Sequence, residues 1–312
     1  MYIPRIKKLK KVNPVKKSYL LLFVVLSSIY SCIDERNSTC PKETQIELSF
    51  EYLANGSKNV IGKYIQFADL LIYNDEGVLH KRLMLTRMEL LSLKHLSLAP
   101  GNYTFVVWGN DGAESALLED ELLTTAQITT PAYHQGKIPQ TNDPLYFSRK
   151  EIVVKPSSVL LSDSSLKETM QFTSANIGFK ILVRGIALED LELSITNLAP
   201  SNNFEMECPL TALVTYMPQQ KQNTVVWPLN GQFYELNTFR FTIDNTIEIN
   251  LQDPKTKEEL IDPIVLRKIL ENQEISINET QELILFIEII VKQTGVTVSV
   301  QSWNDIETVP SN

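Results

Sequence analysis

Alternation of apolar and polar residues is the main pattern in the chain after residue 44. From Ile46 to Tyr52 every second residue is apolar, and polar residues lie between them. A period of two places alternate side chains on opposite faces of a β-strand, so that one face can be buried. The same period recurs in residues 65–73, 103–108, 152–154, 177–184 and 191–195. Such short strands, separated by turn residues, predict an all-β chain of antiparallel sandwiches.

The last two apolar segments give the clearest hairpin. Residues 283–291 are apolar except for Glu288, and a turn separates them from an alternating segment at 296–303. Residues 239–251 predict another hairpin, because polar turn residues at 244–246 divide them. Helical periodicity is weak after the first 31 residues. Two segments fit one short helix each: residues 87–96 and 263–272.

The first 31 residues have the composition of an export signal. Seven Lys and Arg residues precede residue 18, and twelve mainly apolar residues, 19–30, follow. A bilayer span needs about 20 apolar residues, whereas a basic segment before a short apolar run is typical of a secretory signal peptide. The run ends in IYSC at 29–32, which resembles a bacterial lipobox. We expect residues 1–31 to be a lipoprotein signal peptide and Cys32 to carry the lipid. An ordinary secretion signal and an uncleaved anchor are the alternatives.

Residues 32–44 are expected to form a tether. Asp34 and Glu35 follow Cys32 closely, and acidic residues after a lipid-bearing Cys resemble the surface-export signals of Bacteroidetes lipoproteins. Two or three acyl chains hold a protein firmly in a membrane, because each buried methylene contributes about 0.8 kcal/mol. The expected location is therefore the outer membrane, on the cell surface.

A Ser-rich stretch at 157–165 is the expected linker. It divides the chain after the tether into an N-terminal sandwich, residues 45–156, and a C-terminal sandwich, residues 157–312, which both fit the usual size of a domain. Cys40 and Cys208 could form a disulfide outside the cytoplasm. Because 168 positions separate them and Cys40 lies in the tether, two unpaired cysteines are the favoured prediction.

Charge and composition exclude several classes of function. The chain has 29 basic and 37 acidic residues, and seven of the basic residues lie in the signal. The remaining acidic part is unsuited to nucleic acid, whose phosphates need a basic surface. The chain has three His and three Cys, and it lacks the C-x-x-C, G-x-S-x-G, P-loop and G-x-G-x-x-G motifs. We therefore expect no catalytic, cofactor or metal site, and a protein that is not an enzyme.

Three weaker candidates for chemistry have structural explanations. Residues 74–77 faintly resemble a calcium loop but lack its twelve-residue spacing and terminal Glu, so we expect a turn. The acidic run 119–121 could serve glycoside hydrolysis, although solvated carboxylates are expected in so acidic a chain. Trp108 and Trp303 could stack on sugars, but both end alternating strands, where a position in the core or an interface is favoured.

Four segments together resemble the FimB-type anchor subunits of the type V fimbriae of Bacteroidales. They are LIYNDEG at 71–77, LAPGNYTFVVWGN at 98–110, DPLYF at 143–147 and VSVQSW at 298–303. A signal with a lipid-bearing Cys and a short tether precedes them, as in that family. The order and spacing of the segments carry the resemblance, which spans most of the chain.

The resemblance implies two tandem transthyretin-like sandwiches on a lipid anchor, with a structural function. Such an anchor holds the base of a fimbria in the outer membrane, starts assembly and limits fibre length. The implied partners are the outer membrane, through the lipid on Cys32, and fimbrial stalk subunits, through exchange of a donor strand. A donor strand pairs with a free sheet edge, and its alternate side chains fill pockets.

The segment 283–291 is the expected position of the donor-strand groove. Its alternate residues would line that groove: Leu283, Leu285, Ile287, Ile289 and Val291. A central strand that is buried on both faces explains the same apolar run equally well. Two further functions stay open: a tip or accessory subunit of the same fold, and a surface glycan-binding lipoprotein in which Trp227 or Tyr216 forms an aromatic platform.

Overall fold

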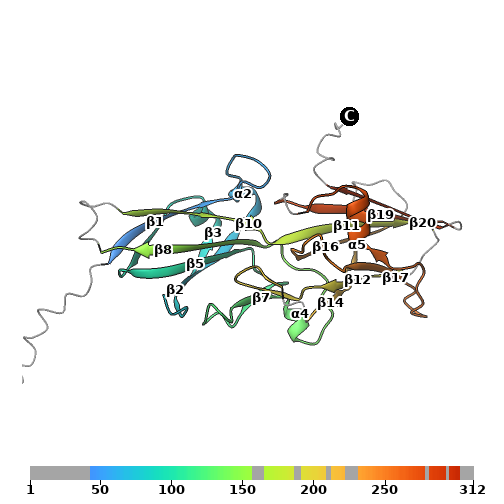
Figure 1. Cartoon of the computed structure of the whole chain (residues 1–312), viewed down its shortest axis with the longest axis horizontal. Helices are drawn as coiled ribbons and strands as arrows, with labels where there is room; N and C mark the ends of the chain where they lie inside the picture. The colour runs from blue at the N-terminus through green and yellow to red at the C-terminus, as the bar shows by residue number, and fades with distance from the viewer. Residues whose placement is uncertain are drawn as a thin grey trace, which may run out of the picture. The chain divides into compact units, whose positions relative to one another are not determined.

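The computed structural model describes residues 43–156, 165–185, 191–208, 212–221, 231–277, 281–292 and 295–302. The chain divides into residues 1–42 and residues 43–312, and all described residues belong to the second unit. The expected signal peptide, Cys32, Cys40, Trp227 and Trp303 lie outside the described residues. Strands dominate the described part, where helices α2 to α5 have only four to seven residues each (Figure 1). The all-β prediction is confirmed.

The first half of the described chain, residues 43–174, forms two sheets with a shared core. Their strand orders are β4-β1-β9 and β10-β8-β5-β2-β3. The strands are β1 Thr44–Glu51, β2 Phe67–Tyr73, β3 Leu79–Thr86, β4 Lys94–Leu98, β5 Gly101–Gly109, β8 Tyr146–Val154, β9 Leu166–Gln171 and β10 Thr173–Ser174. Leu48 of β1 and Phe105 of β5 are fully buried in this core, which joins the two sheets into a sandwich.

Strand β1 shows why the two-residue period predicts this arrangement. Ile46, Leu48 and Phe50 are at most 4% exposed, whereas Glu47 and Ser49 between them are partly exposed. Burial of each apolar side chain contributes roughly 1.5–3 kcal/mol. A slip of one residue would turn all of these side chains to solvent, so the pattern fixes the register of β1 against β4 and β9.

A third sheet covers the other face of the five-stranded sheet. Its order is β13-β7-β6, with β6 Ala116–Leu118, β7 Gln127–Thr129 and β13 Ser201–Asn203. The core beneath it contains Leu71 and Trp108 of the first half together with Phe204 and Phe239, which come from later in the chain. Strands β2 and β5 are therefore buried on both faces, and this explains their nearly continuous apolar sequences.

The second half, residues 175–302, contains two more sheets with a core of their own. Their orders are β15-β16-β11-β19-β20 and β14-β12-β17-β18. The strands are β11 Asn176–Arg184, β12 Glu192–Leu198, β14 Val214–Tyr216, β15 Gln220–Lys221, β16 Gln232–Phe239, β17 Glu248–Gln252, β18 Ile264–Val265, β19 Ile284–Lys292 and β20 Gly295–Ser302. The predicted final hairpin is confirmed, because β19 and β20 pair antiparallel.

Two expectations about connectivity differ from the structure. Strand β9 pairs with β1 and β10 pairs with β8, so the chain completes the first sandwich after the expected boundary at 156/157 and leaves it near Ser174. The hairpin predicted at 239–251 is wrong, because β16 pairs with β11 and β15, whereas β17 pairs with β12 and β18. The polar residues at 244–246 lie where the chain crosses from one sheet to the other, and local turn chemistry does not distinguish these two connections.

The helices are shorter than the sequence predicts. The segment 87–96 is helical only in α3 Arg87–Leu90, where Thr86 accepts a hydrogen bond from the Glu89 N–H and Glu89 reaches back in a capping box. The chain then enters β4, which pairs with β1. The other helices are α2 Ile61–Tyr64, α4 Pro131–His134 and α5 Leu266–Asn272. No helix in the described ranges is long and apolar enough to cross a membrane.

Candidate functional site

Strand β19 lies inside its sheet, with hydrogen-bonded neighbours on both edges. It pairs parallel with β11 and antiparallel with β20. The five residues predicted to line a groove point into the core between the two sheets of the second half, and all are at most 4% exposed: Leu283, Leu285, Ile287, Ile289 and Val291. On the opposite face, Phe286 is buried and Glu288 is half-buried. A central strand therefore accounts for the apolar run, and the groove stays a prediction.

Strand β20 is the last strand of this sheet. Its residues Val296, Val298 and Val300 lie opposite Val291, Ile289 and Ile287, respectively. Only Val300 is fully enclosed, whereas Val296 is 41% exposed. Among the described strands, none pairs with the outer edge of β20. Part of this edge is already bonded, because the Val300 N–H donates to Gln273 Oε1 at 2.8 Å. The three valines are less buried than the β19 residues opposite them, so β20 is held by weaker packing than β19.

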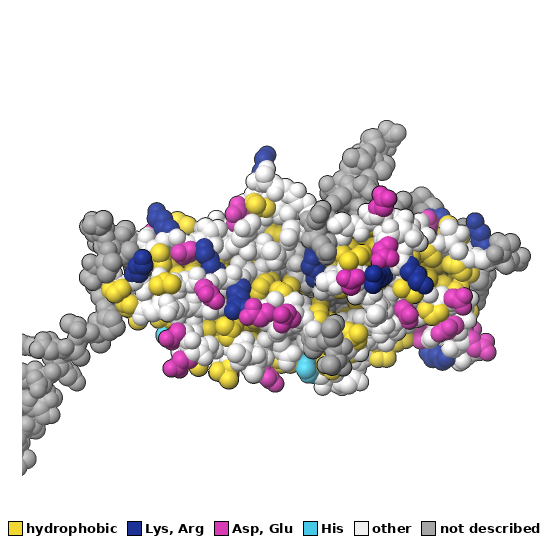
Figure 2. Space-filling model, in the orientation of Figure 1, with side chains coloured by type: hydrophobic (Ala, Val, Ile, Leu, Met, Phe, Trp, Pro, Cys, Tyr) yellow, Lys and Arg dark blue, Asp and Glu magenta, His cyan; other side chains and the backbone are white. Residues whose placement is uncertain are grey.

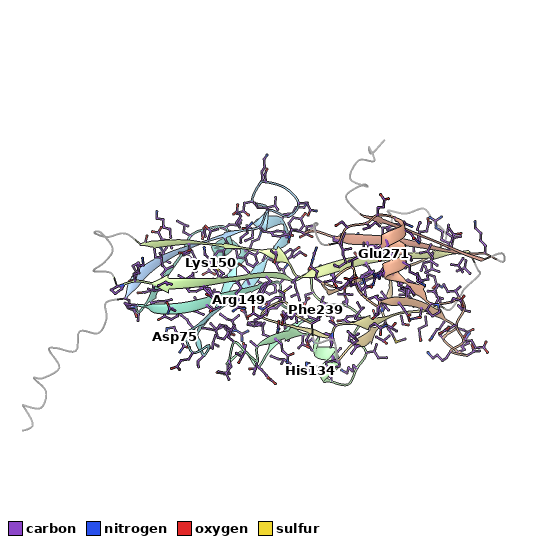
Figure 3. The ribbon with its side chains drawn as sticks, in the orientation of Figure 1. Asp75, His134, Arg149, Lys150, Phe239 and Glu271 are labelled. Carbon is purple, nitrogen blue, oxygen red and sulfur yellow. The ribbon has the colours of Figure 1, made fainter. Side chains whose placement is uncertain are left out.

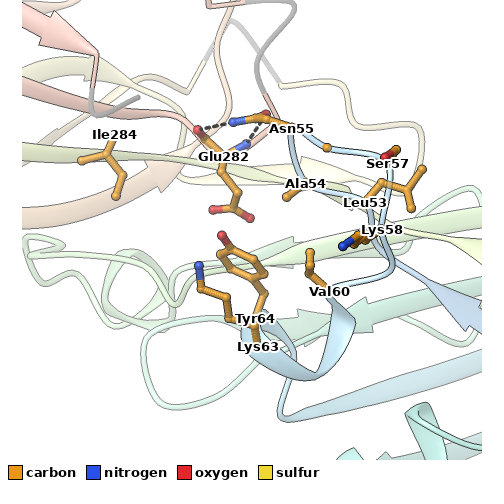
Figure 4. Close-up of a pocket in the computed structure, with 11 residues that line it drawn as sticks. Leu53, Ala54, Asn55, Ser57, Lys58, Val60, Lys63, Tyr64, Glu282 and Ile284 are labelled. Atoms are coloured by element: carbon orange, nitrogen blue, oxygen red, sulfur yellow. Dashed lines mark hydrogen bonds between the residues drawn. The ribbon is translucent and has the colours of Figure 1, made fainter. Parts of the chain in front are cut away.

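A cleft opens where the second half meets the first, beside the start of β19. Its volume is about 530 Å³, and it is lined by the loop at residues 53–60, by α2 and by the residues around Glu282 (Figure 4). Tyr64 points toward the Glu282 carboxylate (Figure 4). Lys63 places its ammonium 4.9 Å from the centre of the Tyr64 ring. The cleft thus combines a partly buried acid, an aromatic ring and two lysines at a single junction.

Glu282 is the main charged group of this junction. Burial raises the pKa of its carboxyl, whereas hydrogen bonds from Tyr52 and Tyr146 act in the opposite direction. The Tyr52 hydroxyl donates to Glu282 Oε1, and burial together with this carboxylate raises the pKa of Tyr52 well above its usual range. Burial lowers the pKa of Arg240 nearby. The sequence did not point to Glu282, because its partner Tyr52 lies 230 residues earlier in the chain.

The aromatic residues considered as sugar platforms are buried where the structure describes them. Trp108 is fully enclosed against Phe147 and Phe204. Tyr216 is also fully enclosed, and its hydroxyl donates to Asn142 Oδ1 at 3.2 Å. Neither ring can stack on a sugar from solvent. The position of Trp108 agrees with the core alternative for an aromatic residue at the end of a strand.

The polar candidates serve local structure. Asn74 Oδ1 accepts hydrogen bonds from the Glu76 and Val78 N–H groups, so residues 74–77 form a turn. Asp120, in the acidic run, pairs with Arg82 at 2.7 Å. Asp75, in this turn, and His134, the last residue of α4, lie on different parts of the molecule (Figure 3). Among the described residues, no three His, Cys, Asp or Glu side chains are grouped so that they could hold a metal ion.

Charge on the described surface is mixed. On the face shown in Figure 2, Lys and Arg side chains are interspersed with Asp and Glu. The ion pairs include Lys150–Glu168 and Lys257–Glu192, both 2.7 Å. The Cys208 thiol donates to Asn202 Oδ1, and burial raises its pKa to about 11. This thiol is free in the structure and little ionised at neutral pH.

The family model for fimbrillin-A associated anchor proteins Mfa1 and Mfa2 matches residues 37–308. The chain belongs to this family of fimbrial anchor proteins. A search of the curated proteins finds no match. The match covers all strands of both halves, so the family includes the whole described fold.

Several solved structures share this fold. The fimbrial anchor protein Mfa2 from Porphyromonas gingivalis superposes with a TM-score of 0.65 at 13% identity, covering 84% of this chain and 98% of that one. A putative polysaccharide binding protein from Bacteroides thetaiotaomicron gives 0.67 at 12% identity, covering 83% and 98%. A putative adhesin from the same organism gives 0.64 at 15% identity, covering 84% and 97%. At these identities the structures show a shared fold.

Proposed function

We propose that this chain is the lipid-anchored base of a fimbria on the outer membrane, and that it accepts a donor strand from the first stalk subunit at β19. The observation that carries the proposal is the match of the anchor family model to residues 37–308. The lipobox-like sequence before Cys32 supports attachment through lipid. The glycan-binding alternative has less support, because Trp108 and Tyr216 are buried.

The weak burial of β20 supports the position of strand acceptance. In our proposal the incoming strand takes the place of β20, opposite Ile287, Ile289 and Val291. The strand that it replaces is held by three valines, one of which is 41% exposed. Each additional buried methylene contributes about 0.8 kcal/mol. A donor with larger alternate side chains would therefore be favoured over β20 while making the same main-chain hydrogen bonds.

In our proposal the same attachment also limits the length of the fibre. A chain whose first mature residue is fixed to lipid has its N-terminal end committed to the membrane. It can accept a strand at β19 but is poorly placed to extend the fibre in both directions. The anchor therefore starts assembly on one side only, and the fibre ends at the anchor.

A reversible lock of β20 onto β19 tests strand acceptance. Ile290 and Thr297 are directly opposite, and opposed residues in antiparallel strands have Cα atoms about 4.5–5.5 Å apart, within the range of a disulfide. We expect the double variant Ile290→Cys/Thr297→Cys to lose stalk binding when oxidised and to regain it after reduction. The matched control is Gln45→Cys/Ser97→Cys, which links β1 to β4 at another opposed pair. Normal stalk binding by the oxidised β19–β20 variant would exclude replacement of β20.

A further inference from the structure

The two residues before Leu283 are held by a side chain from the opposite half of the molecule. Asn55 Oδ1 accepts hydrogen bonds from the Gln281 N–H at 2.8 Å and from the Glu282 N–H at 3.2 Å. Asn55 Nδ2 donates to the Glu282 carbonyl at 3.3 Å (Figure 4). Asn55 lies in the loop between β1 and α2, 226 residues before Gln281. The side-chain amide of Asn55 thus makes hydrogen bonds to this backbone that a neighbouring strand would otherwise make.

Three further polar groups of these two residues are also bound. The Glu282 carboxylate accepts from the Tyr52 hydroxyl, and Gln281 Oε1 accepts from the Ser174 N–H at 3.1 Å. The Gln281 carbonyl accepts from the Arg240 guanidinium at 3.2 Å. Apart from Arg240, every one of these partners belongs to the first half. Hydrogen bonds to both the backbone and the side chains of Gln281 and Glu282 therefore hold this segment in place.

Tyr52 is itself held rigidly. Its side chain is fully buried, and its ring meets Tyr64 and Tyr146 edge-on, with centroids 5.5 and 4.9 Å apart. Aromatic pairs in this geometry add to the stability gained from burial. The Glu282 carboxylate is partly buried, and a carboxylate in such a place is unfavourable without its hydrogen-bond donor. Glu282 therefore has a fixed partner in a fixed place. The start of β19 is therefore positioned by the first half of the chain.

We propose that Asn55 and Tyr52 are positioning residues for strand acceptance, because they keep the start of β19 in place when its neighbour at the β20 position changes. This inference rests on the proposed function. Leu285, near the start of β19, lies opposite Ser302 at the end of β20. Without β20, this part of β19 would keep only β11 as a neighbouring strand, and strands with one free edge open locally from their ends. An acceptor that is already ordered loses less entropy when the donor binds.

Hydrogen exchange on the full chain tests the positioning directly. We expect Asn55→Ala to speed amide exchange of residues 281–287 at least tenfold. The matched control is Asn245→Ala, because Asn245 also makes three hydrogen bonds, all within its own loop: to Thr242, Ile243 and Ile247. The control should leave exchange of 281–287 unchanged. Unchanged exchange in Asn55→Ala would overturn the proposal, whatever the chain does with fimbriae.

The rate at which stalk subunits are released distinguishes a positioning role from an effect on local stability alone. We expect Asn55→Ala and Tyr52→Phe to release bound stalk subunits, purified from the same cells, about tenfold faster than the unmodified chain. Tyr216→Phe, which removes another buried hydroxyl, should release them at the normal rate. If amide exchange of residues 281–287 is faster but stalk subunits are released at the normal rate, the contacts of Asn55 and Tyr52 have only a structural role. That result would overturn the positioning proposal. A failure of the unmodified chain to hold stalk subunits would instead contradict the proposed function, and the positioning proposal would fall with it.

Discussion

The core shared by the two halves gives the sharpest prediction about stability. Phe204 follows β13 in the second half and is 1% exposed, with its ring 5.8 Å from Trp108 and 6.3 Å from Tyr73 of the first half. Truncation of a buried Phe to Ala typically lowers the free energy of unfolding by about 3–5 kcal/mol. We expect Phe204→Ala to have this effect on both halves together, because its ring packs in a core that contains residues of both.

Calorimetry and hydrogen exchange measure this effect. A loss of 1 kcal/mol lowers the Tm of a chain of this size by about 2–4 °C, so Phe204→Ala should lower it by about 6–20 °C. The transition should stay single, and amides of β2 and β12 should exchange faster by similar factors. Met88→Ala is the control, because this side chain is 73% exposed and such substitutions change stability by less than about 0.5 kcal/mol. Two separate transitions, or faster exchange in β12 alone, would refute the shared core as a cooperative link.

Three further predictions concern single residues. Asn110→Ala should lower the free energy of unfolding by about 2–4 kcal/mol in urea titration, because Asn110 bonds to the Gln66 N–H and to the Tyr64 and Pro144 carbonyls; a loss below 0.5 kcal/mol would contradict this. Asp111→Asn should raise the unfolding free energy at pH 7 by about 1–3 kcal/mol. Burial raises the pKa of Asp111 to about 6, so the folded chain becomes less stable as pH rises from about 4 to 6. The gain should therefore vanish below pH 4, and a gain that is equal at both pH values would exclude titration of Asp111. Cys32→Ala should move the protein from the membrane fraction to the soluble fraction and abolish incorporation of labelled palmitate; retention in the membrane fraction would contradict lipidation at Cys32.

The sequence predicts strands that are buried on one face and paired with near neighbours. Strand β1 follows the two-residue period, and the β19–β20 hairpin follows from its turn. The segment FVVW in β5 is apolar on both faces, but the sequence does not show what covers the second face, because the third sheet includes β13, from nearly 100 residues later. The pairing of β9 with β1 depends likewise on residues far apart in the chain. Hydrophobic periodicity contains no information about such distant partners.

The segment 98–110 shows what the structure adds to a recognised motif. A Cβ atom at Gly109 would lie 2.8 Å from Ile65, so only glycine fits there. Asn110 has φ of 61°, in the left-handed region that Asn tolerates, and its side chain joins three segments of backbone. Trp108 fills the shared core. These residues therefore stabilise the fold, whereas the junction of Tyr52, Asn55 and Glu282 was not visible in any local pattern.

Deletion of this gene, followed by electron microscopy of cells and culture supernatant, tests the central claim most directly. The account predicts fibres that are longer than normal and shed into the medium, because the fibre base loses both its membrane attachment and its terminator. Fibres of normal length that stay attached to the deletion strain would contradict the anchor function.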